Sequence, residues 1–176
     1  MKVSILGTDS LDQISRRASL SKRAFGSFIE EVGRLLAKKG VQIIIVPDSE
    51  IALEIARAYK ENNGRRVIGL VPSADEKFEK KHRHYLDLID RKVEYSTWFN
   101  AIRHIVSMSD YSIVMGLSSP AISEIQRFKY LLLFFSIKTK LLVFKNTLSK
   151  KIPKAIEEEL PIIYVTSIKD LEKFIG

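Results

Sequence analysis

Short apolar segments alternate with longer amphipathic ones along almost the whole chain. Six of the short segments are rich in Val, Ile and Leu over four to six residues, which is typical of strands buried on both faces of a sheet. The predicted strands are 2–6, 41–46, 67–71, 111–115, 140–144 and 162–165.

Helical periodicity fills most of the chain between these strands. The clearest helix runs from about Ser21 to Lys39, where apolar residues recur at i, i+3, i+4 and i+7 and Gly40 follows. Further helices are predicted to begin after Ser49, at Ser96 or Thr97, near Ala121, near Lys150 and at Ser167. The stretch up to Leu20 is polar and predicted to be irregular, and 73–94 is predicted to be a charged, partly helical surface excursion.

This alternation predicts parallel βαβ units with helices on both sheet faces. We therefore expect a three-layer αβα, Rossmann-like, doubly wound and mostly parallel sheet of about six strands. No linker or repeat interrupts the pattern, so residues 1–176 are expected to form a single domain.

Composition narrows the function classes. The chain has no cysteine, which excludes disulfides, thiolate metal sites and cysteine nucleophiles. Its apolar run 130–137 is far shorter than the ~20 residues that span a bilayer, so a cytoplasmic protein without a membrane partner is expected. Abundant Lys, Glu and Ile without Cys suit a thermophile. The net charge of +8 favours phosphate-bearing partners, although simple solubility explains it equally well.

Ligands of open α/β sheets bind outside the carboxyl ends of the strands, where the strand order reverses. Three loops, 7–10, 47–49 and 116–121, follow strands here, and the last two lead into helices whose free N–H groups favour anions. The alternative for Ser118 and Ser119 is that one of them only caps the following helix. The predicted ligand-binding residues are Gly7, Thr8, Asp9, Ser10, Pro47, Asp48, Ser49, Gly116, Ser118 and Ser119.

The order and spacing of segments 32–40, 67–72 and Ser109-Asp110 resemble the LOG superfamily over roughly residues 1–144. That superfamily contains lysine-decarboxylase-like proteins, cytokinin-activating phosphoribohydrolases and molybdenum-cofactor carrier proteins. Its signature P-G-G-x-G-T-x-x-E falls on 116–124, where only Glu124 agrees. The glycine and threonine positions carry Leu117, Ser118, Pro120 and Ala121. The phosphate cradle is therefore reshaped or lost, because these residues cannot all give glycine's close backbone approach.

The resemblance also implies a catalytic pair. In its phosphoribohydrolases a glutamate and an arginine act on the N-glycosidic bond, and Glu124 takes the glutamate's place. The family arginine falls near Ala101 or Ile102, so Arg103 is the nearest candidate, offset by one residue. The alternative is a surface carboxylate and a solvated arginine. The histidines at 82–84 lack a ligand cluster, so neither a metal nor a cofactor is predicted.

Three functions follow from these observations. The first is a protein that binds a nucleotide or another phosphorylated ligand without hydrolase activity, because the catalytic signature is eroded. The second is a phosphoribohydrolase acting on a nucleoside 5′-monophosphate. The third is a nucleic-acid-binding module that uses Arg16, Arg17, Lys22, Arg23 and the basic stretch 77–83.

The segment 128–135 is apolar around its whole circumference, which requires burial in the core or in a subunit contact. Proteins of the LOG superfamily commonly form dimers. A homodimer through the helix region 121–135 is therefore expected.

Overall fold

The computed structural model describes residues 1–7, 10–17, 20–72, 83–116, 122, 125–131, 138–148 and 151–176. Its strands are β1 (Lys2–Leu6), β2 (Gln42–Ile45), β3 (Val67–Pro72), β4 (Arg91–Tyr95), β5 (Tyr111–Val114), β6 (Lys140–Phe144) and β7 (Ile162–Val165). Its α-helices are α1 (Leu11–Arg17), α2 (Lys22–Lys38), α3 (Glu50–Glu61), α5 (Trp98–Ser107), α7 (Lys154–Glu157) and α8 (Ile168–Glu172). Residues 125–131 are also helical, and the segments η1 (Arg83–Leu88) and η2 (Lys145–Thr147) are 3-10 helices.

The strands form one sheet in the order β4-β3-β2-β1-β5-β6-β7, and each neighbouring pair is parallel. The chain first builds outward from β1 to β4 and then returns to the other side of β1 with β5. The reversal of strand order lies between β1 and β5. The predicted three-layer, doubly wound architecture is confirmed, with seven strands instead of about six.

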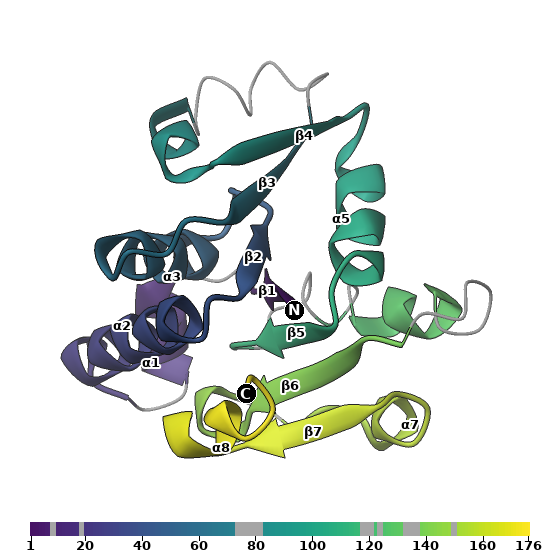
Figure 1. The fold of residues 1–176 in the computed structure, drawn as a ribbon. Helices are drawn as coiled ribbons and strands as arrows, with labels where there is room; N and C mark the ends of the chain where they lie inside the picture. Colours follow the sequence, from purple (N-terminus) through teal and green to yellow (C-terminus); the bar gives the residue numbers. More distant parts are fainter. Residues whose placement is uncertain are drawn as a thin grey trace.

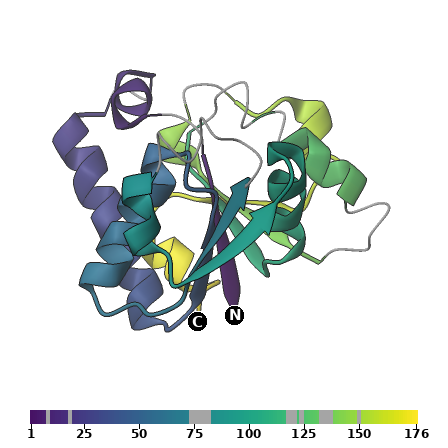
Figure 2. The ribbon, with the colours of Figure 1, turned by 90° about the horizontal axis from the view of Figure 1, so that it is seen from above.

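Helices cover both faces of the sheet (Figures 1 and 2). The helices α1, α2, α3 and α8 pack on one face, while α5, α7 and the helical segment 125–131 pack on the other. Each helical layer covers one hydrophobic core: the first core lies under α1, α2, α3 and α8, and the second core lies under α5, α7 and residues 125–131. Along β2 the side chains alternate between the two cores, with Ile43 and Ile45 in the first and Ile44 in the second. Figure 2 shows both chain ends at the edge of the sheet where β1 begins, called here the amino edge.

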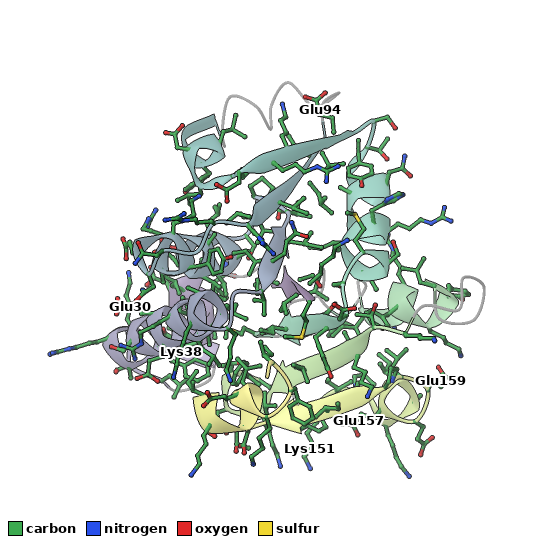
Figure 3. All side chains as sticks on the ribbon, in the orientation of Figure 1. Glu30, Lys38, Glu94, Lys151, Glu157 and Glu159 are labelled. Atoms are coloured by element: carbon green, nitrogen blue, oxygen red, sulfur yellow. The ribbon has the colours of Figure 1, made fainter. Side chains whose placement is uncertain are left out.

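The seventh strand, β4, corrects the prediction for 73–94. Within this stretch, residues 83–88 form a 3-10 helix and Arg91–Tyr95 pair with β3. Only Val93 and Tyr95 pack against the core, and the other three side chains of β4 are charged. Figure 3 shows Glu94 at the outer rim of the sheet. Charges protect an edge strand from pairing with other chains. Here the same charges break the apolar pattern by which a strand is predicted from sequence.

Residues 11–17 also differ from the prediction, because they form α1 instead of an irregular segment. This helix has seven residues and buries Ile14 under the first core, with Leu11 partly buried beside it. Two apolar positions are too few to give a helical period in the sequence. The predicted helix near 150–159 is shorter than expected, since α7 covers only Lys154–Glu157.

Side-chain caps begin four of the helices at the predicted places. Ser21, Ser49, Thr97 and Ser167 each accept a hydrogen bond from the backbone N–H three residues later. These four predicted helix starts are thereby confirmed, and for the helix at 96–97 the structure selects Thr97.

The helices α2 and α3 touch through their backbones at Gly33. A Cβ atom at Gly33 would lie 2.6 Å from the Ala58 Cβ and 2.8 Å from the Ile55 carbonyl oxygen. Gly26, two turns earlier on α2, has no atom within 4 Å of the equivalent point. Gly33 therefore allows a close helix–helix contact that no larger residue permits, whereas Gly26 does not serve this purpose.

Two aspartates at the amino edge of the sheet make the same pair of hydrogen bonds to a neighbouring strand. Asp110, just before β5, donates its N–H to the Lys2 carbonyl (2.9 Å), and its carboxylate accepts the Lys2 N–H (2.7 Å). Asp90, just before β4, makes the same two bonds with Val67, at 2.9 and 2.8 Å. Each aspartate thus binds both backbone groups of the first residue of a neighbouring strand, which fixes the register of the pair.

The predicted dimer segment lies only partly within the described residues, which omit 121, 123–124 and 132–137. In the described part, Ile125, Phe128 and Leu131 are buried in the chain's own second core, whereas Tyr130 is 62% exposed. One face of this helix is therefore packed within the monomer, and the homodimer stays a prediction. Across the part of the chain that the structure describes, no helix has the length and apolarity to cross a membrane.

Candidate functional site

The carboxyl ends of β1 and β5, at the reversal of strand order, come together at two glycines. Gly7 follows β1 with φ 157°, and Gly116 lies two residues after β5 with φ 76°. A Cβ atom at Gly7 would be 2.8 Å from the Met115 carbonyl oxygen, so a larger residue would clash there. The predicted positions Gly7 and Gly116 are thus brought together; both are buried, and the Met115 carbonyl oxygen takes the place that a side chain at Gly7 would need.

A threonine from another loop holds the Gly116 backbone. The Gly116 N–H donates to Thr147 Oγ1 at 3.0 Å, and the same hydroxyl donates to the Phe144 carbonyl at 2.8 Å. Both bonds are buried. Thr147 therefore fixes the course of the chain after β5 from the loop after β6. Sequence reasoning did not find it, because no local pattern links two residues 31 positions apart.

The loop after β2 forms a tight turn that starts α3. The Asp48 N–H donates to the Val46 carbonyl at 2.8 Å, and Pro47 is buried. Ser49 is only 3% exposed, and its hydroxyl accepts the Ala52 N–H at 3.4 Å. Of these predicted ligand-binding residues, Ser49 thus acts as a helix cap.

Glu50, the residue after this cap, reaches across to the loop after β1. Its carboxylate accepts the Leu11 N–H at 3.0 Å, although the two residues are 39 positions apart. Beside it, the predicted Ser10 accepts the Gln13 N–H through its hydroxyl at 3.3 Å and thereby begins α1. The chain's own carboxylate therefore already pairs with a backbone amide at the carboxyl edge.

A surface ion pair lies at the outer end of this region. Lys22 contacts Asp12 at 2.8 Å, and both side chains are largely exposed. The hydrogen bond from Lys22, helped by its charge, lowers the pKa of Asp12, and the same hydrogen bond raises the pKa of Lys22. Lys22, one of the basic residues proposed to meet nucleic acid, is thus paired within the chain, and such exposed pairs add little stability.

The predicted catalytic pair lies only partly within the described residues. Arg103 is exposed on α5, whereas Ala101 and Ile105 on the same helix are buried against the sheet. Arg103 therefore lies on the outer face of α5. Glu124, together with Thr8, Asp9, Ser118 and Ser119, lies outside the described residues. Within the ranges that are described, no group of His, Asp and Glu side chains could hold a metal ion.

A polar hollow of about 540 Å³ opens at the opposite, amino edge of the sheet. The starts of β1, β5 and β6 line it together with the end of α5. Beneath it, the buried hydroxyls of Ser4, Ser109 and Ser112 bond to one another at 2.6–3.4 Å. The carboxyl end of a helix disfavours anions, so we place the candidate phosphate site at the other edge.

No family model matches the chain, and no curated protein matches it either. Solved structures do share its fold. TM1055 aligns with a TM-score of 0.71 at 15% identity, covering 99% of this chain and 97% of its own. The molybdenum cofactor carrier protein of Chlamydomonas reinhardtii gives 0.68 at 12% identity, with 99% and 94% coverage. DNA processing protein A of Helicobacter pylori gives 0.64 at 16%, with 99% and 80% coverage. The chain thus has the Rossmann-like fold of molybdenum cofactor carrier proteins.

Proposed function

We propose that this protein binds a small phosphorylated ligand of the nucleotide type at the carboxyl edge of its sheet. The observation that carries this proposal is the meeting of Gly7 and Gly116 at the reversal of strand order. A phosphate would lie beside these two strand ends, because the Gly116 N–H is held by Thr147 and does not donate to the ligand. The site lies where ligands of open α/β sheets bind.

Two further observations support an anionic ligand. The net charge of +8 attracts negatively charged molecules over long range. Among proteins of the same fold, two neighbours are described as a molybdenum cofactor carrier and a molybdenum cofactor binding protein.

The test is a titration of ¹⁵N-labelled protein with AMP, ADP and pyrophosphate, followed by amide NMR spectra. We expect the Gly7 and Gly116 amide signals to shift. Gly40 and Gly64 precede β2 and β3 at the amino edge and serve as internal controls that should not move. A ligand present at 100 times its Kd should also stabilise the fold by about 2.7 kcal/mol. Unchanged glycine signals together with flat melting temperatures would refute the proposal.

Hydrolysis of a nucleotide remains a prediction of the family resemblance. It needs Glu124 and an arginine, and Arg103 stands on the outer face of α5. We therefore propose binding without assigning a reaction. Release of free base from AMP that Glu124→Gln abolishes would establish catalysis, and no release by folded protein would exclude it for this substrate.

Single-stranded DNA is the second candidate ligand. One structure of the same fold is described by the single-stranded DNA binding mode of DNA processing protein A, and the net charge of this chain is +8. Fluorescence anisotropy of a labelled dT20 oligonucleotide between 50 and 300 mM salt tests it. Phosphate contacts predict an affinity that falls steeply with salt. An anisotropy that does not change with protein concentration would rule this candidate out.

A further inference from the structure

A second hollow, of about 470 Å³, opens between the first half of α2 and the loops that follow β6 and β7. Its volume lies within the range of roughly 300–1,000 Å³ that is usual for small-molecule sites. Unlike the polar hollow at the amino edge, it lies at the carboxyl edge, because β6 and β7 end there. We call it the α2 pocket.

The floor of the α2 pocket is apolar and aromatic. The apolar lining residues are the buried Phe25, the partly buried Leu20, Phe28 and Ile168, and the exposed Ala24. Phe25 is fully buried, and Phe28 packs edge-on against Phe144 with ring centroids 4.8 Å apart at 90°. Since this geometry fixes the Phe28 ring, the floor is a preformed surface for another flat ring.

The rim of the α2 pocket is polar and held by its own hydrogen bonds. Asn146 donates its side-chain N–H to the Thr166 carbonyl at 2.9 Å, which joins the loops after β6 and β7. The Thr166 hydroxyl donates to Asp170 at 2.6 Å. Hydrogen bonds from Lys173, Thr166 and Ser167 hold the pKa of Asp170 well below its ordinary value. The rim is therefore built before any ligand arrives, which lowers the entropic cost of binding.

Thr147 joins this pocket to the candidate phosphate site. It lines the pocket, and its hydroxyl also accepts the Gly116 N–H. The lining carries one negative residue, Glu31, and one positive residue, Lys169. Their charges cancel, so the pocket does not attract a second anionic group besides the phosphate. An uncharged ring suits such a lining better than a phosphate does.

We infer that the α2 pocket holds the uncharged heteroaromatic ring of the ligand, whose phosphate lies at Gly7 and Gly116. This inference rests on the proposed function and narrows the ligand class to phosphorylated compounds that carry a flat ring. Sugar phosphates and inorganic phosphates, which have no aromatic ring, would use only the strand ends.

The test uses Ala24→Trp, which fills the pocket from an exposed position on α2. Ser27→Trp is its matched control, because Ser27 is also exposed on α2 but does not line the pocket. Binding of AMP, adenosine and ribose 5-phosphate is measured by calorimetry for both variants and the wild type. Melting curves confirm that each variant is folded. In wild-type protein, NOEs between adenine protons and the Phe28 ring provide a readout that needs no variant.

We expect Ala24→Trp to weaken AMP at least tenfold and leave ribose 5-phosphate unchanged, while Ser27→Trp changes neither. NOEs to Phe28 would support the same placement. If AMP binds but Ala24→Trp leaves its affinity unchanged and Phe28 gives no NOE, the ring pocket is overturned and the phosphate site stands. If neither phosphorylated probe binds, the proposed function fails. Adenosine binding that Ala24→Trp abolishes would then still support the pocket, and no adenosine binding would overturn it too.

Discussion

The contact between α2 and α3 makes a sharp prediction, because α2 contains two glycines in opposite surroundings. Substitution of either by alanine adds one methyl group to the same helix. At Gly33 that group would meet the Ala58 Cβ, the Ile55 carbonyl oxygen and the Tyr59 nitrogen, all within 3.0 Å. At Gly26 nothing lies within 4 Å. The pair therefore separates intrinsic helix preference from packing.

The expected magnitudes follow from these contacts. Alanine is favoured over glycine inside a helix by about 1 kcal/mol, and this gain applies to both substitutions. Overpacking costs about 1–3 kcal/mol, and Gly33 belongs at the upper end because two of its three neighbours are backbone atoms that cannot rotate away. We expect Gly33→Ala to lose about 2 kcal/mol net and Gly26→Ala to gain about 1 kcal/mol.

Thermal unfolding followed by circular dichroism measures both effects. In a chain of this size 1 kcal/mol corresponds to about 2–4 °C in Tm. Gly33→Ala should therefore melt about 4–8 °C below the wild type, and Gly26→Ala about 2–4 °C above it. Urea unfolding with an unchanged m-value would show that only stability differs. Equal or higher Tm for Gly33→Ala than for Gly26→Ala would refute the α2–α3 contact described here.

Three further substitutions test other hydrogen bonds. Thr147→Val leaves the buried Gly116 N–H without its acceptor, so urea unfolding should show a loss of about 1–3 kcal/mol; no loss would contradict this role. Tyr59→Phe removes a buried bond of 2.7 Å to the Val41 carbonyl, and differential scanning calorimetry should show a loss of about 1 kcal/mol. In the folded protein the pKa of Asp170 is lowered, so its stabilising effect is present above the unfolded-state pKa of about 3.9 and is lost as the pH falls below it. Asp170→Asn should therefore be less stable than the wild type at pH 7, and urea titrations from pH 5 to pH 2 should show the difference narrowing; a constant difference would argue against the shift.

The inner strands were predictable because burial on both faces leaves a continuous apolar run. The strand β6 lies at its predicted bounds for this reason, with Leu141 to Phe144 all buried. The edge strand β4 was missed because three of its five side chains are charged. Its strand character comes from pairing with β3, which the local sequence does not encode.

The candidate site was predictable only in its backbone. The positions of Gly7 and Gly116 follow from the rule that loops after parallel strands gather at one edge. Their surroundings depend on Thr147 and Glu50, which arrive from other loops through bonds over 31 and 39 positions. Such contacts are products of the tertiary fold, and a single sequence gives no signal for them.

The bonds of Asp90 and Asp110 have a consequence for how this scaffold can diverge. Each aspartate fixes the register of a strand pair at the amino edge of the sheet. The loops at the carboxyl edge therefore do not have to fix it. Loops at the carboxyl edge can then change in sequence without sliding one strand past another. The residues that align the strands and the loops in which a ligand site could change thus lie at opposite edges of the same sheet.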